Sequence, residues 1–447
     1  MNGFVYAALG SVRMGYLGGG TSILIRILLV LICAALLVLL YALRNHLAFQ
    51  FAIGLPALGV ATFYVVRGQI EAGYEDPQHT YVIPKAPAVC AAATNASLSA
   101  PLAALGEPED FGYPAKTIDR IEVRDLLIEA SYDALDSLLT AYSDSARRDF
   151  RLEYRMLDAY SAFSTAAPTL EPFMDDWIRT HPTSGNAYIV RATYYTAAAW
   201  HERGAARAGR TSYRQALAAR RYFNRALSDL DSAVRRKPCS VMAYKGYMAI
   251  APYVGDTAMS RDAMDEALRI QPYSYVVREE QMLNLRPRWG GSHEAMELLA
   301  RESDSLSTRN PRLHALHGFA DWDKADIAER HREPARALEL YDHALSFGDL
   351  WRFRFERGQL YHALGRDEEA LADLQRALVQ RPQHAELIHR IASTKYELGR
   401  YAYGSEQHRL FYESYGDESL AALLDPADED VQESMAFYKQ NIPEYAH

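Results

Sequence analysis

Apolar residues recur three and four positions apart along most of the chain from residue 120 to residue 420. This spacing places them on one face of an α-helix. It is clear at Ala263, Ala267 and Ile270, and looser in residues 118–144. Two long uncharged stretches precede this region, at residues 27–43 and 47–66. We therefore predict an all-α protein with an N-terminal membrane segment.

The first uncharged stretch, ILLVLICAALLVLLYAL, would span about 26 Å as a helix, which nearly crosses a bilayer. The second is less apolar because it contains glutamine, glycine and proline. Three interpretations remain open: a helical hairpin that turns at residues 44–46, one spanning helix followed by an interfacial segment, and a cleaved signal peptide. The signal peptide fits least well, because no small-x-small cleavage site follows the apolar run. The hairpin fits best, and we expect lipid contact through residues 23–66.

Arginines around this segment indicate its orientation. Arg13, Arg26 and Arg67 flank the predicted hairpin on one side, and Arg44 marks its turn. Positive residues favour the cytoplasmic side. The hairpin interpretation therefore places the soluble region in the cytoplasm, on the basis of a small difference in positive charge between its two sides. If only the first stretch spans the membrane, the soluble region lies on the opposite side.

The helical region repeats itself with a period of 33 or 34 residues. Such a period indicates tetratricopeptide-type helix pairs, which must stack to bury their apolar faces. We predict a tetratricopeptide-like α-solenoid whose first helices line a concave surface suited to binding. The matched pairs are Ala233-Val234 with Ala267-Leu268, Pro238 with Pro272, Ala344-Leu345 with Ala377-Leu378, and Gly365 with Gly399.

Residues 351–384 form the clearest repeat. Small residues let its two helices approach closely, a glycine ends the first helix in a left-handed cap, and a proline stops the second. Arg354 and Arg357 stand where tetratricopeptide repeats usually have Trp and Leu, which weakens the prediction of tight docking on the preceding repeat. The residues that match the repeat pattern are Gly358, Tyr361, Gly365, Ala370, Leu374, Ala377 and Pro382.

The stretch LNLRPRWGGSHEAMELLA, residues 283–300, interrupts the helical pattern. Pro287 ends one helix, Gly290 and Gly291 permit a turn with unusual dihedral angles, and Ser292 caps the next helix. We predict that Trp289 fills the gap that this turn opens between neighbouring repeats. The stretch is therefore interpreted as a joint rather than a catalytic loop.

Residues 172–204, PFMDDWIRTHPTSGNAYIVRATYYTAAAWHERG, followed by LRPRWGGS at residues 285–292, resemble the bacterial domain-of-unknown-function family 4034. The resemblance covers about residues 120–305 and supplies no active-site role. It implies a helical domain and a bacterial source. Together with the membrane segment it predicts an integral protein of the bacterial inner membrane.

Charge and cysteine content narrow the function. The net charge of -9 is spread along the chain without a basic run, so we expect no nucleic-acid partner. Of the three cysteines, Cys33 lies in the apolar run, which leaves Cys90 and Cys239 as the possible soluble pair. One optional disulfide leaves the redox compartment open.

Two side-chain groups are candidates for chemistry. Trp200 and Arg203, with Arg207 and Arg210, form either a clamp for a carboxylate or a solvated helix end, and Trp289 joins them as a candidate partner contact. The second group is a possible metal patch on one helix face, for which ordinary helix residues are the preferred interpretation, so no metal and no cofactor are expected. Its residues are His314, His317 and Asp321.

We predict a membrane-anchored helical-repeat scaffold that binds a protein or peptide and has no catalysis of its own. The alternative is an envelope hydrolase or transferase with a site near residues 200–210 and 289–293. The expected organisation is a membrane segment at 1–71, an Ala/Pro-rich linker at 72–118, a helical repeat domain at 119–306, tetratricopeptide-like repeats at 307–424 and an acidic tail at 425–447.

Overall fold

The computed structural model describes residues 81–91, 118–204 and 211–442, and none of these lies in a β-strand. The chain divides into two units, Met1–His79 and Thr80–His447, and the account below concerns the second. The predicted membrane segment at 1–71 lies outside the described residues. Among the helices that the structure describes, none combines the length and apolar character needed to cross a bilayer.

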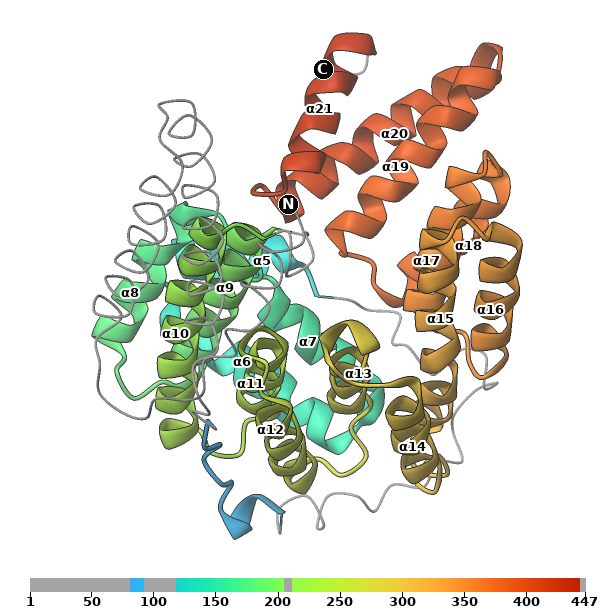
Figure 1. Cartoon of the computed structure of the whole chain (residues 1–447). Helices are drawn as coiled ribbons and strands as arrows, with labels where there is room; N and C mark the ends of the chain where they lie inside the picture. Colours follow the sequence, from blue (N-terminus) through green and yellow to red (C-terminus); the bar gives the residue numbers. More distant parts are fainter. Residues whose placement is uncertain (1–80, 92–117, 205–210, 443–447) are drawn as a thin grey trace, which may run out of the picture. The chain divides into compact units, whose positions relative to one another are not determined.

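The described helices pair into antiparallel hairpins, as the repeat period predicts (Figure 1). Four helices come first: α5 (Arg120–Ile128), α6 (Tyr132–Arg148), α7 (Glu153–Ser161) and α8 (Glu171–Thr180). The hairpins are α9 (Gly185–Arg203) with α10 (Tyr213–Arg236), α11 (Val241–Val254) with α12 (Thr257–Ile270), α13 (Tyr275–Asn284) with α14 (His293–Asp304), α15 (Phe319–Arg330) with α16 (Pro334–Ser346), α17 (Trp351–Ala363) with α18 (Asp367–Gln380), and α19 (Ala385–Tyr401) with α20 (Gly404–Leu424). A last helix is α21 (Glu429–Asn441), and a 3-10 helix, η7 (Pro311–Gly318), leads into α15.

A recurring local signal sets the boundaries between hairpins. Helices α8, α12 and α18 end just before a proline, and the residue two positions after that proline caps the next helix. Ser184 Oγ accepts from the backbone N–H of Ala187, and Ser274 Oγ accepts from that of Val277. His384 Nδ1 accepts from the N–H of Leu387 at 3.4 Å in the same position. The period in the sequence therefore reflects one repeated turn chemistry.

The repeat at 351–384 has the predicted geometry. A Cβ added to Gly358 would lie 2.9 Å from Leu374 Cγ, so the close approach of α17 and α18 requires glycine there. Gly365 has φ +70° and ends α17 in the left-handed region. Ala370 and Ala377 are fully buried between the helices. Pro382 stands between α18 and α19, where the pattern needs a helix breaker.

The two arginines that depart from the repeat pattern are accommodated by ion pairs. Asp373, whose side chain is 4% exposed, accepts from Arg354 Nη1 at 2.7 Å and from Arg357 Nε at 2.6 Å. Arg354 Nε also donates to Asp349 at 2.7 Å, next to the preceding hairpin. The guanidinium of Arg366 packs on Tyr361 and lies 4.4 Å from the centre of the tyrosine ring. A charged network therefore replaces the apolar contact that Trp and Leu usually supply.

Residues 81–91, which we call the N-terminal strap, belong to the predicted Ala/Pro-rich linker at 72–118 and are bound to the helical array. Cys90 is fully buried and bonded to Cys239, with the two Cα atoms 5.3 Å apart. The Tyr81 hydroxyl donates to Asp231 at 2.6 Å, and the backbone N–H of Ala86 donates to Glu266 at 2.8 Å. The strap is thus fixed to α10, to the segment between α10 and α11, and to α12 by one covalent bond and by polar contacts.

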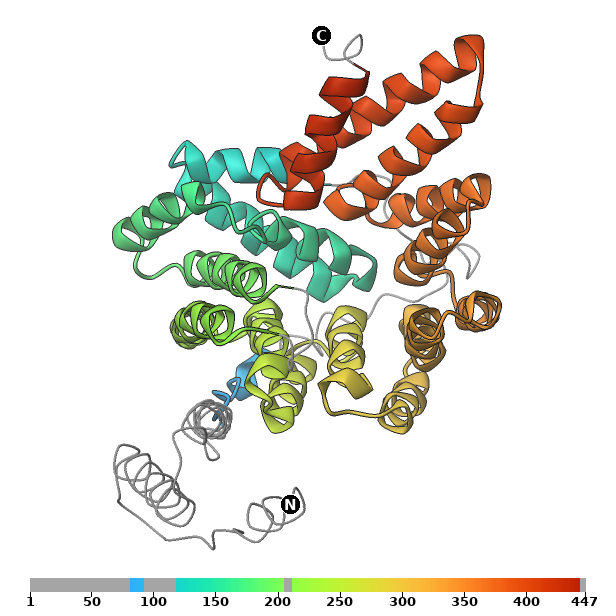
Figure 2. The same ribbon diagram turned by 45° about the horizontal axis from the view of Figure 1, so that its top comes forward.

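The array of hairpins curves back on itself, so that α20 returns beside α5 (Figure 2). Arg124 donates to the backbone carbonyls of Leu423 at 2.5 Å and Leu424 at 3.0 Å. The hydroxyl of Thr165 donates to Asp425 at 2.9 Å. A side chain of α5 and one from the segment after α7 therefore form hydrogen bonds with the end of the last hairpin.

The concave side of this curve is occupied by the chain itself, which corrects the prediction of an open binding groove. Helix α7 lies at the centre of the array in Figures 1 and 2. Glu153 accepts from Gln271 Nε2 at 2.7 Å and from the N–H of Tyr275 at 3.0 Å. At the other end of α7, Asp158 accepts from Arg381 at 2.7 Å. The predicted concave surface is therefore an internal interface.

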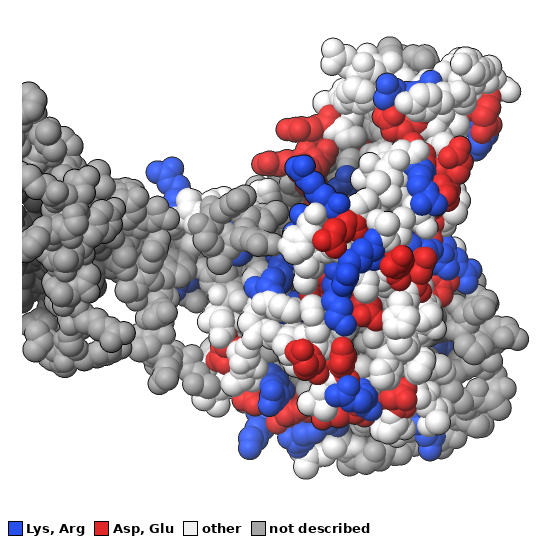
Figure 3. Space-filling model, turned by 45° about the vertical axis from the view of Figure 1, so that its right-hand side comes forward, with Lys and Arg blue, Asp and Glu red and all other residues white. Residues whose placement is uncertain are grey.

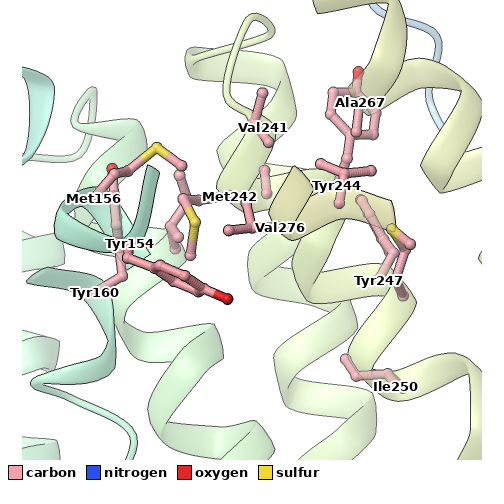
Figure 4. Close-up of a cluster of buried hydrophobic side chains, with 14 of the residues drawn as sticks. Tyr154, Met156, Tyr160, Val241, Met242, Tyr244, Tyr247, Ile250, Ala267 and Val276 are labelled. Atoms are coloured by element: carbon pink, nitrogen blue, oxygen red, sulfur yellow. The ribbon is translucent and has the colours of Figure 1, made fainter. Parts of the chain in front are cut away.

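Apolar packing reinforces these polar contacts. Figure 4 shows Tyr154, Met156 and Tyr160 of α7 beside Met242 of α11. Met156 is 2% exposed and Tyr160 is fully buried. Burial of each such side chain contributes about 1.5–3 kcal/mol. No sequence period predicts this packing, because α7 lies outside the 34-residue repeat.

The end of the chain also differs from the prediction. Residues 425–447 were expected to form an acidic tail, but 429–441 form α21, which packs on α20. Asp428 caps this helix by accepting from the N–H of Val431. Val431, Met435 and Tyr438 are buried at four-residue and three-residue spacing on one face. Glu429, Asp430 and Glu433 are therefore exposed on the outer face of a packed helix.

Candidate functional site

The joint between α13 and α14 has the predicted backbone geometry. Pro287–Trp289 form one turn of 3-10 helix, and Gly290 follows with φ +87°. A Cβ on Gly291 would lie 2.1 Å from the carbonyl oxygen of Leu285, so only glycine fits this turn. Ser292 Oγ then accepts from the N–H of Ala295 at 3.2 Å. The turn thereby aims Trp289 away from the helix that it follows.

Trp289 meets Trp200, which stands near the C-terminal end of α9. Their ring centres are 5.8 Å apart in an edge-to-face arrangement. Trp200 in turn meets Phe223 of α10 at 5.4 Å, and Phe223 meets Tyr253 of α11 at 4.2 Å. This row of rings, which we call the aromatic ladder, connects the joint to two hairpins. Aromatic pairs of this kind contribute about 0.5–1.5 kcal/mol each beyond their burial.

Arg203 and Arg288 place positive charge on the ladder. The guanidinium of Arg203 lies 5.5 Å from the ring centre of Trp200 and 5.7 Å from that of Trp289. Arg288 lies 4.8 Å from the ring centre of Trp289 and is exposed. Partial desolvation of the guanidinium by the surrounding chain and the neighbouring Arg286 lower the pKa of Arg288, although the residue as a whole is exposed. The aromatic ladder therefore ends at the Trp289 indole, which has the guanidinium groups of Arg203 and Arg288 beside it.

Three of the five candidate partner contacts thus come together, although 89 positions separate the two tryptophans in the sequence. Arg203 is only 6% exposed and donates to the carbonyl of Gly204 at 3.1 Å, so it also holds the two indoles in place. Arg207 and Arg210 lie outside the described residues. Arg288 was missed, although its position beside Trp289 could have suggested it.

The joint is also linked to the next hairpin by charge. Arg286 pairs with Asp323 and, at 2.6 Å, with Asp326 of α15. His293 Nε2 lies 2.8 Å from the second oxygen of Asp323. The guanidinium of Arg286 also lies 4.5 Å from the ring centre of Trp322. Of residues 289–293, which the alternative function would use for catalysis, His293 therefore links the joint to α15, together with the preceding Arg286.

A pocket of about 630 Å³ opens farther along the array, between η7 and the hairpin of α17 and α18. Its walls include Ser307, His314 and Phe347 on one side and Arg354 and Arg376 on the other. Asp349 accepts from both of these arginines at 2.7 Å. The arginines are therefore held in place at the pocket wall by a shared carboxylate.

Neither charge sign predominates over the described residues of the face drawn in Figure 3. Figure 3 shows Lys and Arg interspersed with Asp and Glu over the described residues of the face on the side of α16 and α18. Pairs such as Arg366 with Glu369 at 2.5 Å account for this pattern. Such exposed pairs contribute little to stability. They give the outer surface a mixed polar character, whereas the ladder edge carries rings and arginines.

Comparison with known proteins gives one family match. Residues 119–259 match the model described as "Domain of unknown function (DUF4034)", which confirms the resemblance carried by residues 172–204. The match ends before the joint at 285–292, so it is shorter than predicted. The search of curated proteins found no match.

Among solved structures, one similar chain comes from the structure titled "Crystal structure of APC/C hetero-tetramer Cut9-Hcn1". It is 13% identical over 70% of the present chain, with a TM-score of 0.27. The present chain covers 54% of the length of that protein.

Proposed function

We propose that this protein is a membrane-anchored helical-repeat scaffold that binds a protein or peptide partner and has no catalysis of its own. The observation that carries the proposal is the meeting of Trp200 and Trp289 under the guanidinium groups of Arg203 and Arg288. Partly exposed tryptophans and arginines are the residue types that contribute most at protein interfaces. Because α7 fills the concave side, we place the partner at the edge where the ladder ends.

The chemistry of this edge indicates the kind of partner. An exposed cation beside a partly exposed indole favours a peptide that brings a carboxylate next to an apolar or aromatic side chain. Arg288 supplies the accessible charge, whereas Arg203 is only 6% exposed. We therefore propose an acidic peptide segment as the bound element.

Charge reversal tests this site directly. In the Arg288→Glu variant of the full-length chain, purified from detergent-solubilised membranes, the co-purified partner should be lost. Arg336→Glu is the matched control, because the Arg336 side chain is 71% exposed on α16, away from the ladder. If both variants retain the same co-purified proteins as the unaltered chain, the ladder edge is not the binding site.

For the location, we propose that the repeat domain lies on the extracytoplasmic side of a bacterial inner membrane, held by a single N-terminal span. The bond between Cys90 and Cys239 supports this choice over the cytoplasmic placement, because disulfides persist in oxidising compartments. Protease added to spheroplasts should degrade the repeat domain while a cytoplasmic marker protein stays intact. Protection of the domain until the membrane is lysed would contradict the extracytoplasmic placement.

A further inference from the structure

A cluster of metal-ligating groups lies beside the 630 Å³ pocket, well away from the aromatic ladder. It consists of Asp304, the last residue of α14, with His314 and His317 of η7. One ligand atom from each residue lies within 4.8 Å of the other two. His314 Nδ1 is 2.9 Å from Asp304 Oδ1, and His317 Nε2 is 3.8 Å from the same oxygen.

The secondary structure explains why these two histidines converge. In a 3-10 helix there are about three residues per turn, so side chains at i and i+3 stand one above the other. His314 and His317 have this spacing within Pro311–Gly318. The sequence-based patch assumed a continuous α-helix and therefore included Asp321. In the structure Asp321 belongs to α15 and pairs with His343 Nδ1 at 2.6 Å.

Packing fixes the orientation of the imidazoles. The ring of Phe347 lies 6.0 Å from that of His314 and 5.6 Å from that of His317. Burial lowers the pKa of His317, whereas Asp304 acts in the opposite direction. Arg301 also acts on His317, but its guanidinium is exposed and lies 3.9 Å from Glu297.

We propose that Asp304, His314 and His317 bind one divalent transition-metal ion of the zinc type. Two imidazole nitrogens and one carboxylate oxygen suit zinc, whereas calcium and magnesium prefer oxygen ligands alone. The ion takes the place of the hydrogen bond between His314 Nδ1 and Asp304 Oδ1. Three protein ligands leave a fourth position, and His314 also lines the pocket. The bound ion therefore lies where a pocket ligand can reach it.

The test is calorimetric titration of the chelator-treated full-length chain with zinc chloride. We expect one zinc ion per chain, and His314→Ala and His317→Ala should each weaken binding about 100-fold. The matched control is His343→Ala, because the ring of His343 also packs on Phe347, at 5.1 Å, but lies outside the cluster. This control should bind zinc as the unaltered chain does.

Two further measurements separate metal binding from folding. Asp304→Asn keeps the size and hydrogen-bonding capacity of the side chain but removes its charge, so it should weaken zinc binding with unchanged circular dichroism. Cobalt added in place of zinc should give a visible absorption band in the unaltered chain that is absent from the two histidine variants. The absence of stoichiometric zinc binding, or equal binding by all the variants, would overturn the proposal.

Discussion

The disulfide between Cys90 and Cys239 allows a worked prediction of stability. The two residues are separated by 149 positions, so the bond closes a long loop in the unfolded chain. In the chain-entropy model a loop of this length lowers the entropy of the unfolded state by about 17 cal/mol/K, or about 5 kcal/mol at 25 °C. We expect the Cys90→Ser/Cys239→Ser double variant to lose about 3–5 kcal/mol of unfolding free energy, since replaced native bonds usually give slightly less than the full entropic value.

The assay is urea unfolding of the oxidised chain, the reduced chain and the double variant, followed by circular dichroism. Thiol titration of the unfolded chain controls the state of the bond, because three cysteines should give one free thiol before reduction and three after it. The reduced chain and the double variant should unfold at the same lowered urea concentration. A double variant within about 1 kcal/mol of the oxidised chain would refute the reasoning, because the bond would then impose no constraint that the strap contacts do not already supply.

Three further predictions concern single side chains. Gly291→Ala should destabilise the chain by about 1–3 kcal/mol, because its Cβ would meet the Leu285 carbonyl, whereas Gly416→Ala, which meets nothing within 4 Å, should be neutral or stabilising in the same thermal melt. Burial raises the pKa of Glu153 to about 7, so the folded state keeps a proton that the unfolded state releases from pH 4.5 upward, and stability falls by about 3 kcal/mol as pH rises through 7. Glu153→Gln lacks this proton, so its stability should not show this loss. The unfolding free energy of the variant minus that of the unaltered chain should therefore rise by about 3 kcal/mol between pH 4.5 and 7.5. A difference that stays constant over this range would exclude the effect. Asp373→Ala should cost about 3 kcal/mol in urea unfolding, because two arginines lose a buried partner, and a wild-type midpoint would show that the network contributes nothing.

Features that follow from local chemistry could be predicted from the sequence. Gly365 ends a helix because of its own backbone freedom, and Pro382 stops one through its missing N–H, so both were found at the correct positions. The joint at Gly290 and Gly291 was predictable for the same reason. These residues act on their immediate neighbours in the chain, and the repeat period then extends the result to whole hairpins.

Features that depend on the curvature of the array could not be predicted in this way. The period shows that hairpins stack, but it does not show how sharply each turns relative to the last. The placement of α7 against Gln271 and Arg381 depends on this rotation between successive hairpins, and no local sequence signal indicates it. Asp304 was missed for a related reason, because its approach to His314 depends on a 3-10 helix that the spacing alone does not distinguish from an α-helix.

The contact between the end of the array and its beginning affects folding during synthesis on the ribosome. Thr165 and Asp425 meet across 260 positions of sequence. A ribosome that adds about 5–20 residues per second needs about 13–50 s to traverse that interval. During this time the central helix has emerged while hairpins that will enclose it do not yet exist. Newly made chains therefore wait for their last hairpins before Asp158 gains Arg381 and Thr165 gains Asp425.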